Sequence, residues 1–532
     1  RSVRNRTARL WLRPEPGQDP EPRDVPVLDR RALLVGEPLA GPALIVDDTT
    51  TFVLEPPFVA TLQNDGVLVA TLRTDPSNES NASVIPSNTK DAESAKPEAP
   101  AADPATLEIF HRRFAGIAEE MGRRLERTAR SVNIRERLDF SCALFDAEGR
   151  LVANAPHIPV HLGSMGEAVR ATKADRTDWQ PGDAVLHNDP AAGGSHLPDL
   201  TVVAPVFRAE IEPRTKAPIT SPDHGTEAEP SESPSSEPAS SEPVFWLAAR
   251  GHHVDVGGVR PGSMPPFSQT LEEEGLVVRN HLLVREGSFL DAELRKALAQ
   301  GRWPARRPTD NVADLQAQVA AVEAGKQSLA RLVADWGYDS TQAYAHHLQQ
   351  HAREMMLAAI DPLLADGPKR WSDTLDDGAE IHVEIRRRES ASKTSPASAP
   401  QLIVDFTGTA GPRPGNLNAP PAVARAAVLY ALRCLLDREL PLNEGALDAV
   451  EIRLPSPSLL SPPPSAAVVG GNVEVSQRVV DVVLGALGVA AASQGTMNNL
   501  TFGVATSPGG SVNAASNAAA SREEGAQHYE TI

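Results

Sequence analysis

Histidines and carboxylates gather in two short segments that could together bind a metal ion. The first segment reads HNDPAAGGSHLPD and the second reads RGHHVDVGG. His196 and Asp199 are three residues apart across Pro198, so both side chains can reach one point, and His252 or His253 could complete the site. A hydrolytic metal site needs neutral imidazoles and carboxylates on a rigid backbone, with one position left for water. Nitrogen and oxygen ligands without thiolate suit manganese, iron, zinc or nickel alike.

A purely structural role competes with this interpretation, because Asp and His side chains near glycines often hydrogen-bond their own loops. The same choice arises in a third segment, PHIPVHLGSM, which carries His157 and His161 between prolines and a glycine. Buried, hydrogen-bonded histidines would explain that segment as well as ligands or substrate contacts would.

Two glycine-rich turns each precede an apolar run that is typical of a helix. One contains Gly470, Gly471 and Asn472, and the other is the sequence GNLNAP at 415–420. Backbone N–H groups at such a helix start favour an anion such as a carboxylate or phosphate, although a tight turn with helix capping is the commoner arrangement. Neither turn matches a Walker A or dinucleotide fingerprint, so we predict no nucleotide site in this chain.

The elements that position these residues begin with a small β module over residues 1–73. Apolar and β-branched residues alternate there, and Asn64-Asp65-Gly66 between two such runs predicts a hairpin. Residues 74–104 are poor in large apolar side chains and rich in Ser, Pro, Glu and Ala. We therefore predict a disordered linker over 74–104.

A larger domain of α+β (mixed α/β) class is predicted over 105–532. It opens with an amphipathic helix, whose apolar stripe recurs every three or four residues: Phe110, Phe114, Ile117, Met121 and Leu125. Strand-like runs follow, then helices over roughly 311–336, 341–360, 422–436 and 477–492. Low-complexity composition predicts disordered insertions at about 209–243 and 389–400.

Composition excludes several classes of partner. The 532 residues carry 51 Lys and Arg against 70 Asp and Glu, a net charge of -19, which disfavours nucleic acid and anionic membranes. No apolar run is long enough to cross a bilayer, and Cys142 and Cys434 cannot form a disulfide framework or a thiolate metal site. The cysteine usage therefore predicts a reducing compartment. The chain has no initiating Met and stops at HYETI, so we predict that it is an internal piece of a longer protein.

Several motifs, taken in order, resemble the hydantoinase B/oxoprolinase family from about Ala105 to the end of the chain. They are NIRERLDFSC, NAPHIPVHLGSM, AGGSHLPDLTVVAPVF, RGHHVDVGGVRPGSMPP, GNLNAP, AAVVGGNVEVSQRVVD and SQGTMNNLTFG. The first module, GPALIVDDTTTFVLEPPFVATLQNDGVLVA, resembles the end of the hydantoinase A half, which precedes the B half on one polypeptide in some members. The actin-like ATPase part of that half is absent from this sequence.

The resemblance implies ATP-dependent hydrolysis of 5-oxo-L-proline to L-glutamate, in the cytosolic turnover of glutathione. The missing hydantoinase A half would use ATP and Mg to phosphorylate the amide oxygen, and this half would open the ring with metal-activated water. The family pattern of ligands maps onto His196, Asp199 and His252. Asp255, His161 and Asp189 are expected as catalytic or supporting residues, and Gly470, Gly471, Asn472 and His253 as substrate-binding residues.

The resemblance implies 5-oxo-L-proline and the hydantoinase A-type ATPase domain as partners, and a homo-oligomer in the form of a dimer. Two other classes stay open. One is a related ATP-dependent N-methylhydantoinase or ketone carboxylase, and the other is a catalytically inert scaffold.

Overall fold

A computed structural model describes most of the chain, which divides into two compact units. The described residues are 6–12, 21–46, 51–54, 58–62, 68–72, 102–155, 158, 161, 163–212, 242–388, 401–436, 441, 443–490, 492, 495, 501–503 and 529–531. The first unit spans Arg1–Pro97 and the second Glu98–Ile532. The linker predicted over 74–104 lies outside the described residues up to 101, and the predicted insertions lie largely or wholly outside them.

The first unit is built from two small sheets. One sheet has the strand order β1-β2-β4-β5 and the other β3-β6-β7. The strands are β1 (Arg6–Leu12), β2 (Glu21–Asp29), β3 (Pro38–Ala40), β4 (Ala43–Val46), β5 (Thr51–Leu54), β6 (Phe58–Leu62) and β7 (Leu68–Leu72). Strands β6 and β7 pair antiparallel, as the hairpin prediction requires.

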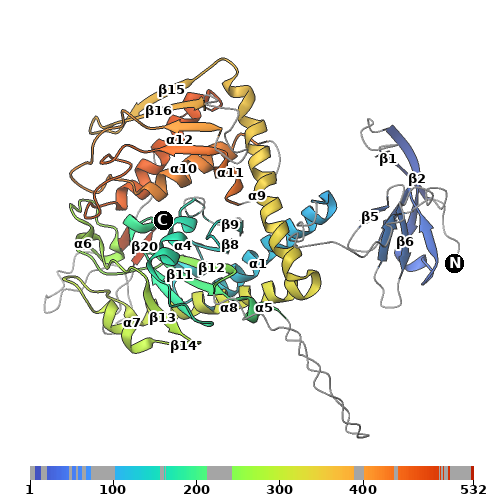
Figure 1. The fold of residues 1–532 in the computed structure, drawn as a ribbon, viewed down its shortest axis with the longest axis horizontal. Coiled ribbons are helices and arrows are strands. Elements are labelled where there is room, and N and C mark those ends of the chain that lie inside the picture. The colour runs from blue at the N-terminus through green and yellow to red at the C-terminus, as the bar shows by residue number, and fades with distance from the viewer. Residues whose placement is uncertain are drawn as a thin grey trace, which may run out of the picture. The chain divides into compact units, whose positions relative to one another are not determined.

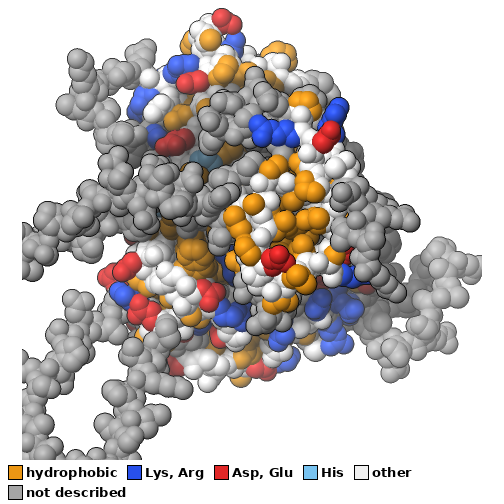
Figure 2. All heavy atoms as spheres, turned by 90° about the vertical axis from the view of Figure 1, so that its right-hand side faces the viewer, with side chains coloured by type: hydrophobic (Ala, Val, Ile, Leu, Met, Phe, Trp, Pro, Cys, Tyr) orange, Lys and Arg blue, Asp and Glu red, His pale blue; other side chains and the backbone are white. Residues whose placement is uncertain are grey.

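The core of this first unit is small. Ala43, Ile45, Leu54 and Ala60 form its buried cluster. Large hydrophobic side chains of the unit are also exposed, among them Leu34 and Phe52. Figure 2 shows hydrophobic side chains exposed among Lys, Arg, Asp and Glu side chains on one face.

A seven-stranded sheet forms the centre of the second unit (Figure 1). Its order is β14-β13-β10-β11-β12-β8-β9, and every neighbouring pair is antiparallel. The strands are β8 (Phe140–Asp146), β9 (Leu151–Asn154), β10 (Ala184–His187), β11 (Asp199–Val206), β12 (Phe245–His252), β13 (His281–Arg285) and β14 (Ser288–Phe289). Strands β11 and β12 are buried along their whole length, which explains their near-continuous apolar sequence.

Helices cover both faces of this sheet. Helices α1 (Pro104–Thr128) and α8 (Pro308–Trp336) contact one face, and α4 (Met165–Asp175) contacts the other. Helix α1 starts where the sequence predicts, because Asp103 accepts a hydrogen bond from the Thr106 N–H and Pro104 occupies the first helical position. Its predicted apolar stripe is buried. The shorter helices are α2 (Val132–Arg135), α5 (Arg208–Ile211), α6 (Leu271–Glu274) and α7 (Asp291–Leu298).

A second, four-stranded sheet carries its own helices. Its order is β15-β16-β17-β18, and α10 (Pro421–Arg433), α11 (Gly445–Asp448) and α12 (Ser476–Leu487) belong to the same core. The strands of this sheet are β15 (Lys369–Thr374), β16 (Glu380–Arg387), β17 (Leu402–Asp405) and β18 (Val450–Arg453). Strands β19 (Thr501–Gly503) and β20 (Tyr529–Thr531) form a separate two-stranded sheet.

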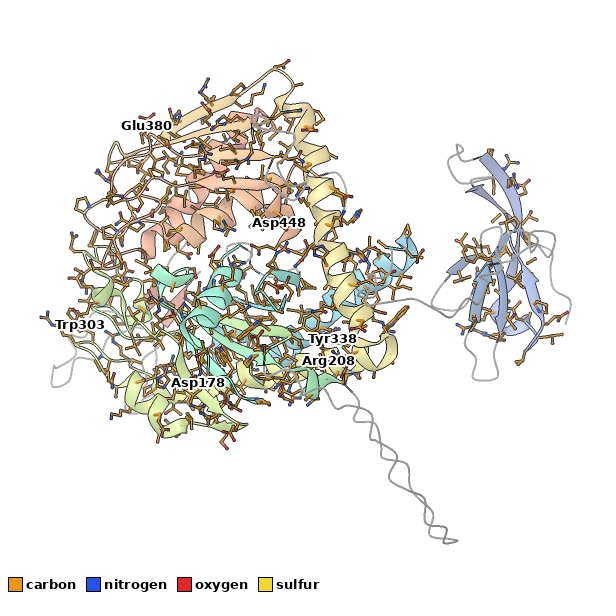
Figure 3. All side chains as sticks on the ribbon, in the orientation of Figure 1. Asp178, Arg208, Trp303, Tyr338, Glu380 and Asp448 are labelled. Atoms are coloured by element: carbon orange, nitrogen blue, oxygen red, sulfur yellow. The ribbon has the colours of Figure 1, made fainter. Side chains whose placement is uncertain are left out.

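Helix α9 (Tyr338–Ile360) links the two cores. The Tyr344 ring stacks on Phe110 of α1 at 4.6 Å between centroids, whereas Met356 and Ile360 are buried against the second sheet. At the start of α9, the Arg208 guanidinium lies 4.3 Å from the centroid of the Tyr338 ring (Figure 3). The predicted mixed α/β class is confirmed. None of the helices in the described ranges is long and apolar enough to span a membrane.

Candidate metal centre

The candidate site lies where β11 begins and β12 ends. Asp199, the first residue of β11, pairs with His252, the last residue of β12. Directly opposite residues in an antiparallel pair project to the same face of the sheet, so the two side chains meet. The antiparallel register thus joins two segments that the long insertion separates in sequence.

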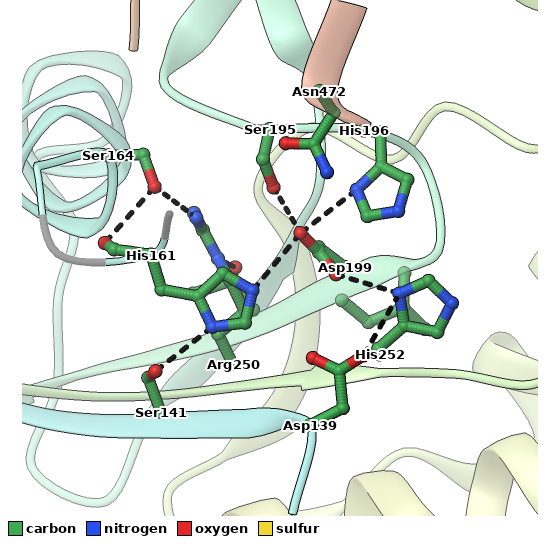
Figure 4. A network of polar contacts seen from close by, with 12 residues as sticks. Asp139, Ser141, His161, Ser164, Ser195, His196, Asp199, Arg250, His252 and Asn472 are labelled. Atoms are coloured by element: carbon green, nitrogen blue, oxygen red, sulfur yellow. Dashed lines mark hydrogen bonds and ion pairs between the residues drawn. The ribbon is translucent and has the colours of Figure 1, made fainter. Parts of the chain in front are cut away.

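His196, Asp199 and His252 form one buried cluster (Figure 4). His196 Nδ1 lies 3.0 Å from Asp199 Oδ2, and His252 Nδ1 lies 3.2 Å from Asp199 Oδ1. The three ligand-type atoms all lie within 4.8 Å of one another. Among the described residues, this is the one group of His, Cys, Asp and Glu with that geometry.

The turn before β11 brings His196 to this point. Asp189 accepts a hydrogen bond from the Ala191 N–H and so starts a short 3-10 helix, Pro190–Ala192. Gly193 follows with φ 93°, and a Cβ there would lie 2.2 Å from the Ala168 nitrogen in α4. The Gly193 position therefore needs both left-handed backbone and the absence of a side chain, which explains its glycine.

His196 Nδ1 is buried without a hydrogen-bond partner, although Asp199 Oδ2 lies 3.0 Å away. The short distance therefore does not correspond to a hydrogen bond of ordinary geometry. The unbonded lone pair of His196 Nδ1 is therefore available to a cation bound beside the Asp199 carboxylate. Two imidazoles and one carboxylate fit manganese, iron or zinc.

Electrostatics favour an ionised carboxylate at the centre. Burial raises the pKa of Asp199, but the charges of His196 and His161 outweigh it and hold this pKa well below its usual range. Burial disfavours a charged His252, yet Asp139 and Asp199 raise its pKa overall. A metal ion coordinated by His252 would displace the proton from its imidazole, so metal binding would release a proton.

His161, which the sequence suggested as a supporting residue, joins the network through Asp199. Its Nε2–H donates to Asp199 Oδ2 at 3.2 Å, and its Nδ1 lies 2.9 Å from the Ser141 hydroxyl. Ser195 donates to the same Oδ2. The position of the Asp199 carboxylate is therefore fixed by side chains from three segments, as a metal ligand requires.

Arg250 is a fully buried cation on the same strand as His252. Two residues apart on β12, the pair shares one face of the sheet. Arg250 Nε donates to Thr201 Oγ1 at 2.8 Å, and its other nitrogens donate to Ser164 Oγ and the Gly193 carbonyl. Burial lowers the pKa of Arg250 to about 10. Through these hydrogen bonds Arg250 links the turn at Gly193, the start of α4 and strand β11.

His253, predicted as a substrate contact, faces the opposite side of the sheet. Asn311 Nδ2 donates to its Nδ1 at 3.1 Å, and its Nε2–H donates to Gln318 Oε1 at 3.0 Å. Burial lowers the pKa of His253. Both ring nitrogens of His253 are therefore hydrogen-bonded to side chains of helix α8. Of the two candidate histidines, it is His252 that lies beside Asp199.

Asp255 and Asp189, predicted as catalytic candidates, are engaged in holding loops. Asp255 accepts hydrogen bonds from the N–H groups of Gly257, Gly262 and Arg306 and pairs with the Arg306 guanidinium at 3.0 Å. Asp189 caps the turn and lies 3.5 Å from Arg279. Neither residue belongs to the cluster.

In the glycine turn at 470–472, two backbone N–H groups donate within the protein, and the Asn472 side chain lies beside the cluster. The Gly471 N–H donates to the Asn416 carbonyl and the Asn472 N–H to the Val468 carbonyl. A Cβ on Gly471 would lie 1.9 Å from the Asn418 oxygen, and one on Gly470 2.8 Å from Asn416 Oδ1, so the glycines permit close packing. Asn472 lies beside Ser195 and His196, and its buried Oδ1 has no partner (Figure 4).

Sequence reasoning gave no role to Asp139, Ser141, Ser195 or Arg250. All four lie inside the quoted family motifs, and Arg250 precedes His252 by two residues. Strand periodicity was therefore the available signal for Arg250. The contacts of Asp139 and Ser141 depend on strand pairing, which the sequence does not specify.

The chain resembles known proteins over most of its length. The sequence profile described as Hydantoinase B/oxoprolinase matches residues 103–532. 5-Oxoprolinase 1 of Arabidopsis thaliana is 40% identical over 90% of this chain and 35% of its own length, and 5-oxoprolinase of Dictyostelium discoideum is 38% identical over 90% and 34%. The chain thus spans about a third of the length of these relatives.

Two solved structures share the fold. An ATP-dependent caprolactamase from Pseudomonas jessenii has a TM-score of 0.60 and 25% identity, covering 74% of this chain and 61% of that one. An acetone carboxylase has a TM-score of 0.58 at 17% identity, covering 72% and 48%, a likeness of fold alone. With the profile match across 103–532, the resemblance seen in the motifs is confirmed, and the chain belongs to the hydantoinase B/oxoprolinase family.

Proposed function

We propose that this chain supplies the ring-opening part of an ATP-dependent enzyme that hydrolyses 5-oxo-L-proline to L-glutamate. The observation that carries the proposal is the buried His196–Asp199–His252 cluster with its unbonded His196 Nδ1. The relatives named 5-oxoprolinase support the substrate, and the caprolactamase supports the wider class of cyclic amides.

His196, Asp199 and His252 are the residues that would hold a divalent metal. Such an ion lowers the pKa of a bound water towards about 7 and so supplies a nucleophile at neutral pH. His161 and Ser195 keep the Asp199 carboxylate in place, and Asp139 lies 3.8 Å from His252 Nδ1. The unpaired Asn472 oxygen offers a hydrogen-bond acceptor beside His196.

Ring opening adds one water across the amide bond. The hydroxyl goes to the carbonyl carbon, the C–N bond breaks, and the proton goes to the leaving amine. Amide resonance makes the lactam a poor electrophile, so we propose that ATP activates it through phosphorylation by a hydantoinase A-type domain. The transferred group leaves as inorganic phosphate at the cost of a second water, so the overall products are L-glutamate, ADP and phosphate. The length of the relatives supports such a domain, because the chain covers only about a third of them.

The cellular setting follows from the proposed substrate. We propose a role in glutathione turnover in the cytoplasm and a dimeric enzyme, as the family resemblance implies. An N-methylhydantoinase or ketone carboxylase would use the same cluster on a different activated substrate.

The test is turnover by the full-length protein that contains this chain. With ATP and a divalent metal, we expect L-glutamate to form from 5-oxo-L-proline, and removal of the metal by a chelator to stop it. Turnover of N-methylhydantoin or acetone in place of 5-oxo-L-proline would contradict the proposed substrate. Full activity after verified metal removal would contradict the proposed role of the cluster.

A further inference from the structure

A cavity of about 370 Å³ lies beside the chain segment that carries Asp139. Its lining includes Arg137, Leu138 and Phe140 on either side of Asp139, together with Arg123, Glu119 and Glu126 of α1. Asp139 itself accepts a hydrogen bond from the His252 N–H through its carbonyl at 3.0 Å. One short segment therefore contacts the cluster and lines the cavity at the same time.

The backbone of this segment is strained at Leu138. Its φ is 56°, in the left-handed region that a leucine rarely adopts, and its side chain is 45% exposed. The Asp139 N–H donates to the Asn133 carbonyl at 2.9 Å, which helps to hold the turn. Strain of this kind concentrates at functional sites, where it aims particular side chains. Here it separates Asp139, which approaches His252, from Arg137, which lines the cavity.

Arg137 is the cation in this cavity that has no anionic partner among the described residues. Arg123 lies 3.6 Å from Glu119, whereas no described carboxylate lies within ion-pair distance of Arg137. Asp139, two residues after Arg137, lies 3.8 Å from His252 Nδ1, so the segment that carries Arg137 reaches the cluster. A guanidinium so placed can bind a carboxylate through two parallel hydrogen bonds.

We infer that Arg137 binds the carboxylate of the cyclic-amide substrate, in the cavity beside Asp139 and His252. This inference rests on the proposed function, since 5-oxo-L-proline carries one carboxylate next to its ring nitrogen. It also supplies the anion contact that the turn at Gly471 does not offer, because the N–H groups there donate within the protein. Arg137 is then the residue that selects lactams with a carboxylate over plain lactams.

The experiment compares two lactams in the full-length protein. 5-Oxo-L-proline carries the carboxylate and 2-pyrrolidinone lacks it. In Arg137→Met we expect KM for 5-oxo-L-proline to rise about 10- to 100-fold, the usual effect of losing a charged hydrogen-bonded contact, with kcat little changed. Turnover or competitive inhibition by 2-pyrrolidinone should stay within about twofold. Arg137→Lys should restore part of the loss, and metal content should not change.

Arg123→Met is the matched control, because it removes a neighbouring cation that already has a partner. It should leave KM for both lactams near the wild-type values. An unchanged KM in Arg137→Met, or an equal loss for both lactams, would overturn the inference while leaving the proposed function intact. If the wild-type protein does not hydrolyse 5-oxo-L-proline, the proposed function fails, and calorimetric binding of the two lactams to wild type and Arg137→Met still tests the carboxylate contact.

Discussion

At the scale of single residues, the choice between His252 and His253 shows what strand geometry decides. Both follow the same apolar strand, and the sequence left either one able to complete the cluster. Because successive residues of a strand face opposite sides, the register that places Asp199 opposite His252 sends His253 to Gln318. The sequence indicated the residue types, but only the pairing of β11 with β12 determines which histidine is available.

The acidic candidates show that residue type alone does not distinguish a catalytic carboxylate from a structural one. Asp255 lies three residues after His252 and matched the chemistry of the site by type alone. Its oxygens instead accept four hydrogen bonds or ion-pair contacts from the loop around Gly257 and Arg306. A carboxylate near glycines serves loop geometry as readily as catalysis, and only contacts distinguish the two.

Glu274 is a buried carboxyl group whose proton should affect stability. Burial raises its pKa to about 7 from 4.5, although the N–H groups of Val468 and Val469 oppose that rise. A raised folded-state pKa means that the folded protein holds the proton more tightly. Stability contributed by that proton is present below about pH 4.5 and is lost as the pH rises through about 7.

We therefore expect Glu274→Gln, which cannot ionise, to gain stability relative to wild type as the pH rises from 4.5 to 7. The gain should be about 3 kcal/mol, since one pKa unit corresponds to about 1.4 kcal/mol. Urea denaturation of both proteins across this range measures it. A difference between the two proteins that does not vary with pH would show that Glu274 does not titrate there.

At the scale of elements, close packing of backbones determines where the site residues lie. The Gly471 turn packs against the Asn418 carbonyl, and Gly193 packs against α4. The sequence predicted helices after both glycine-rich turns, and α10 and α12 are found there. The sequence also suggested an anion site at Gly471, because it does not reveal whether a backbone N–H group is free or already hydrogen-bonded within the protein.

Gly471→Ala should destabilise the protein by about 1–3 kcal/mol, because the new Cβ would meet a backbone oxygen that cannot move freely. Gly116→Ala is the control. A Cβ there meets nothing within 4 Å inside helix α1, so we expect a gain of about 0.5–1 kcal/mol. Chemical denaturation of both variants tests the contrast, and equal effects would contradict this account of the turn.

At the scale of the whole molecule, sequence patterns predicted single strands and helices better than the way in which they assemble. Period-two runs gave the strands, and the apolar stripe gave α1, because these patterns report the buried face of each element directly. The antiparallel order of the seven strands depends on contacts between residues far apart in the chain, such as Val206 with Phe245. Pairings of that kind leave no periodic trace in one sequence.

That pairing predicts that the segment between β11 and β12 can be shortened. The Val244 N–H donates to the Val206 carbonyl at 2.8 Å, so the strands are already joined on both sides of the segment. Replacing residues 213–241 with a short Gly-Ser linker should leave the melting temperature and the metal content unchanged. Loss of soluble protein or of metal would show that the segment contributes to the fold.

The central claim is that His196, Asp199 and His252 hold a divalent metal. Its direct test is metal content, by plasma mass spectrometry, of purified full-length protein carrying His196→Ala, Asp199→Ala or His252→Ala, with circular dichroism as the folding control. His253→Ala is the matched variant, since that neighbouring histidine binds helix α8. We expect the first three variants to fold and to lose most of their metal, while His253→Ala keeps it. Full metal occupancy in folded His196→Ala and Asp199→Ala would contradict the account.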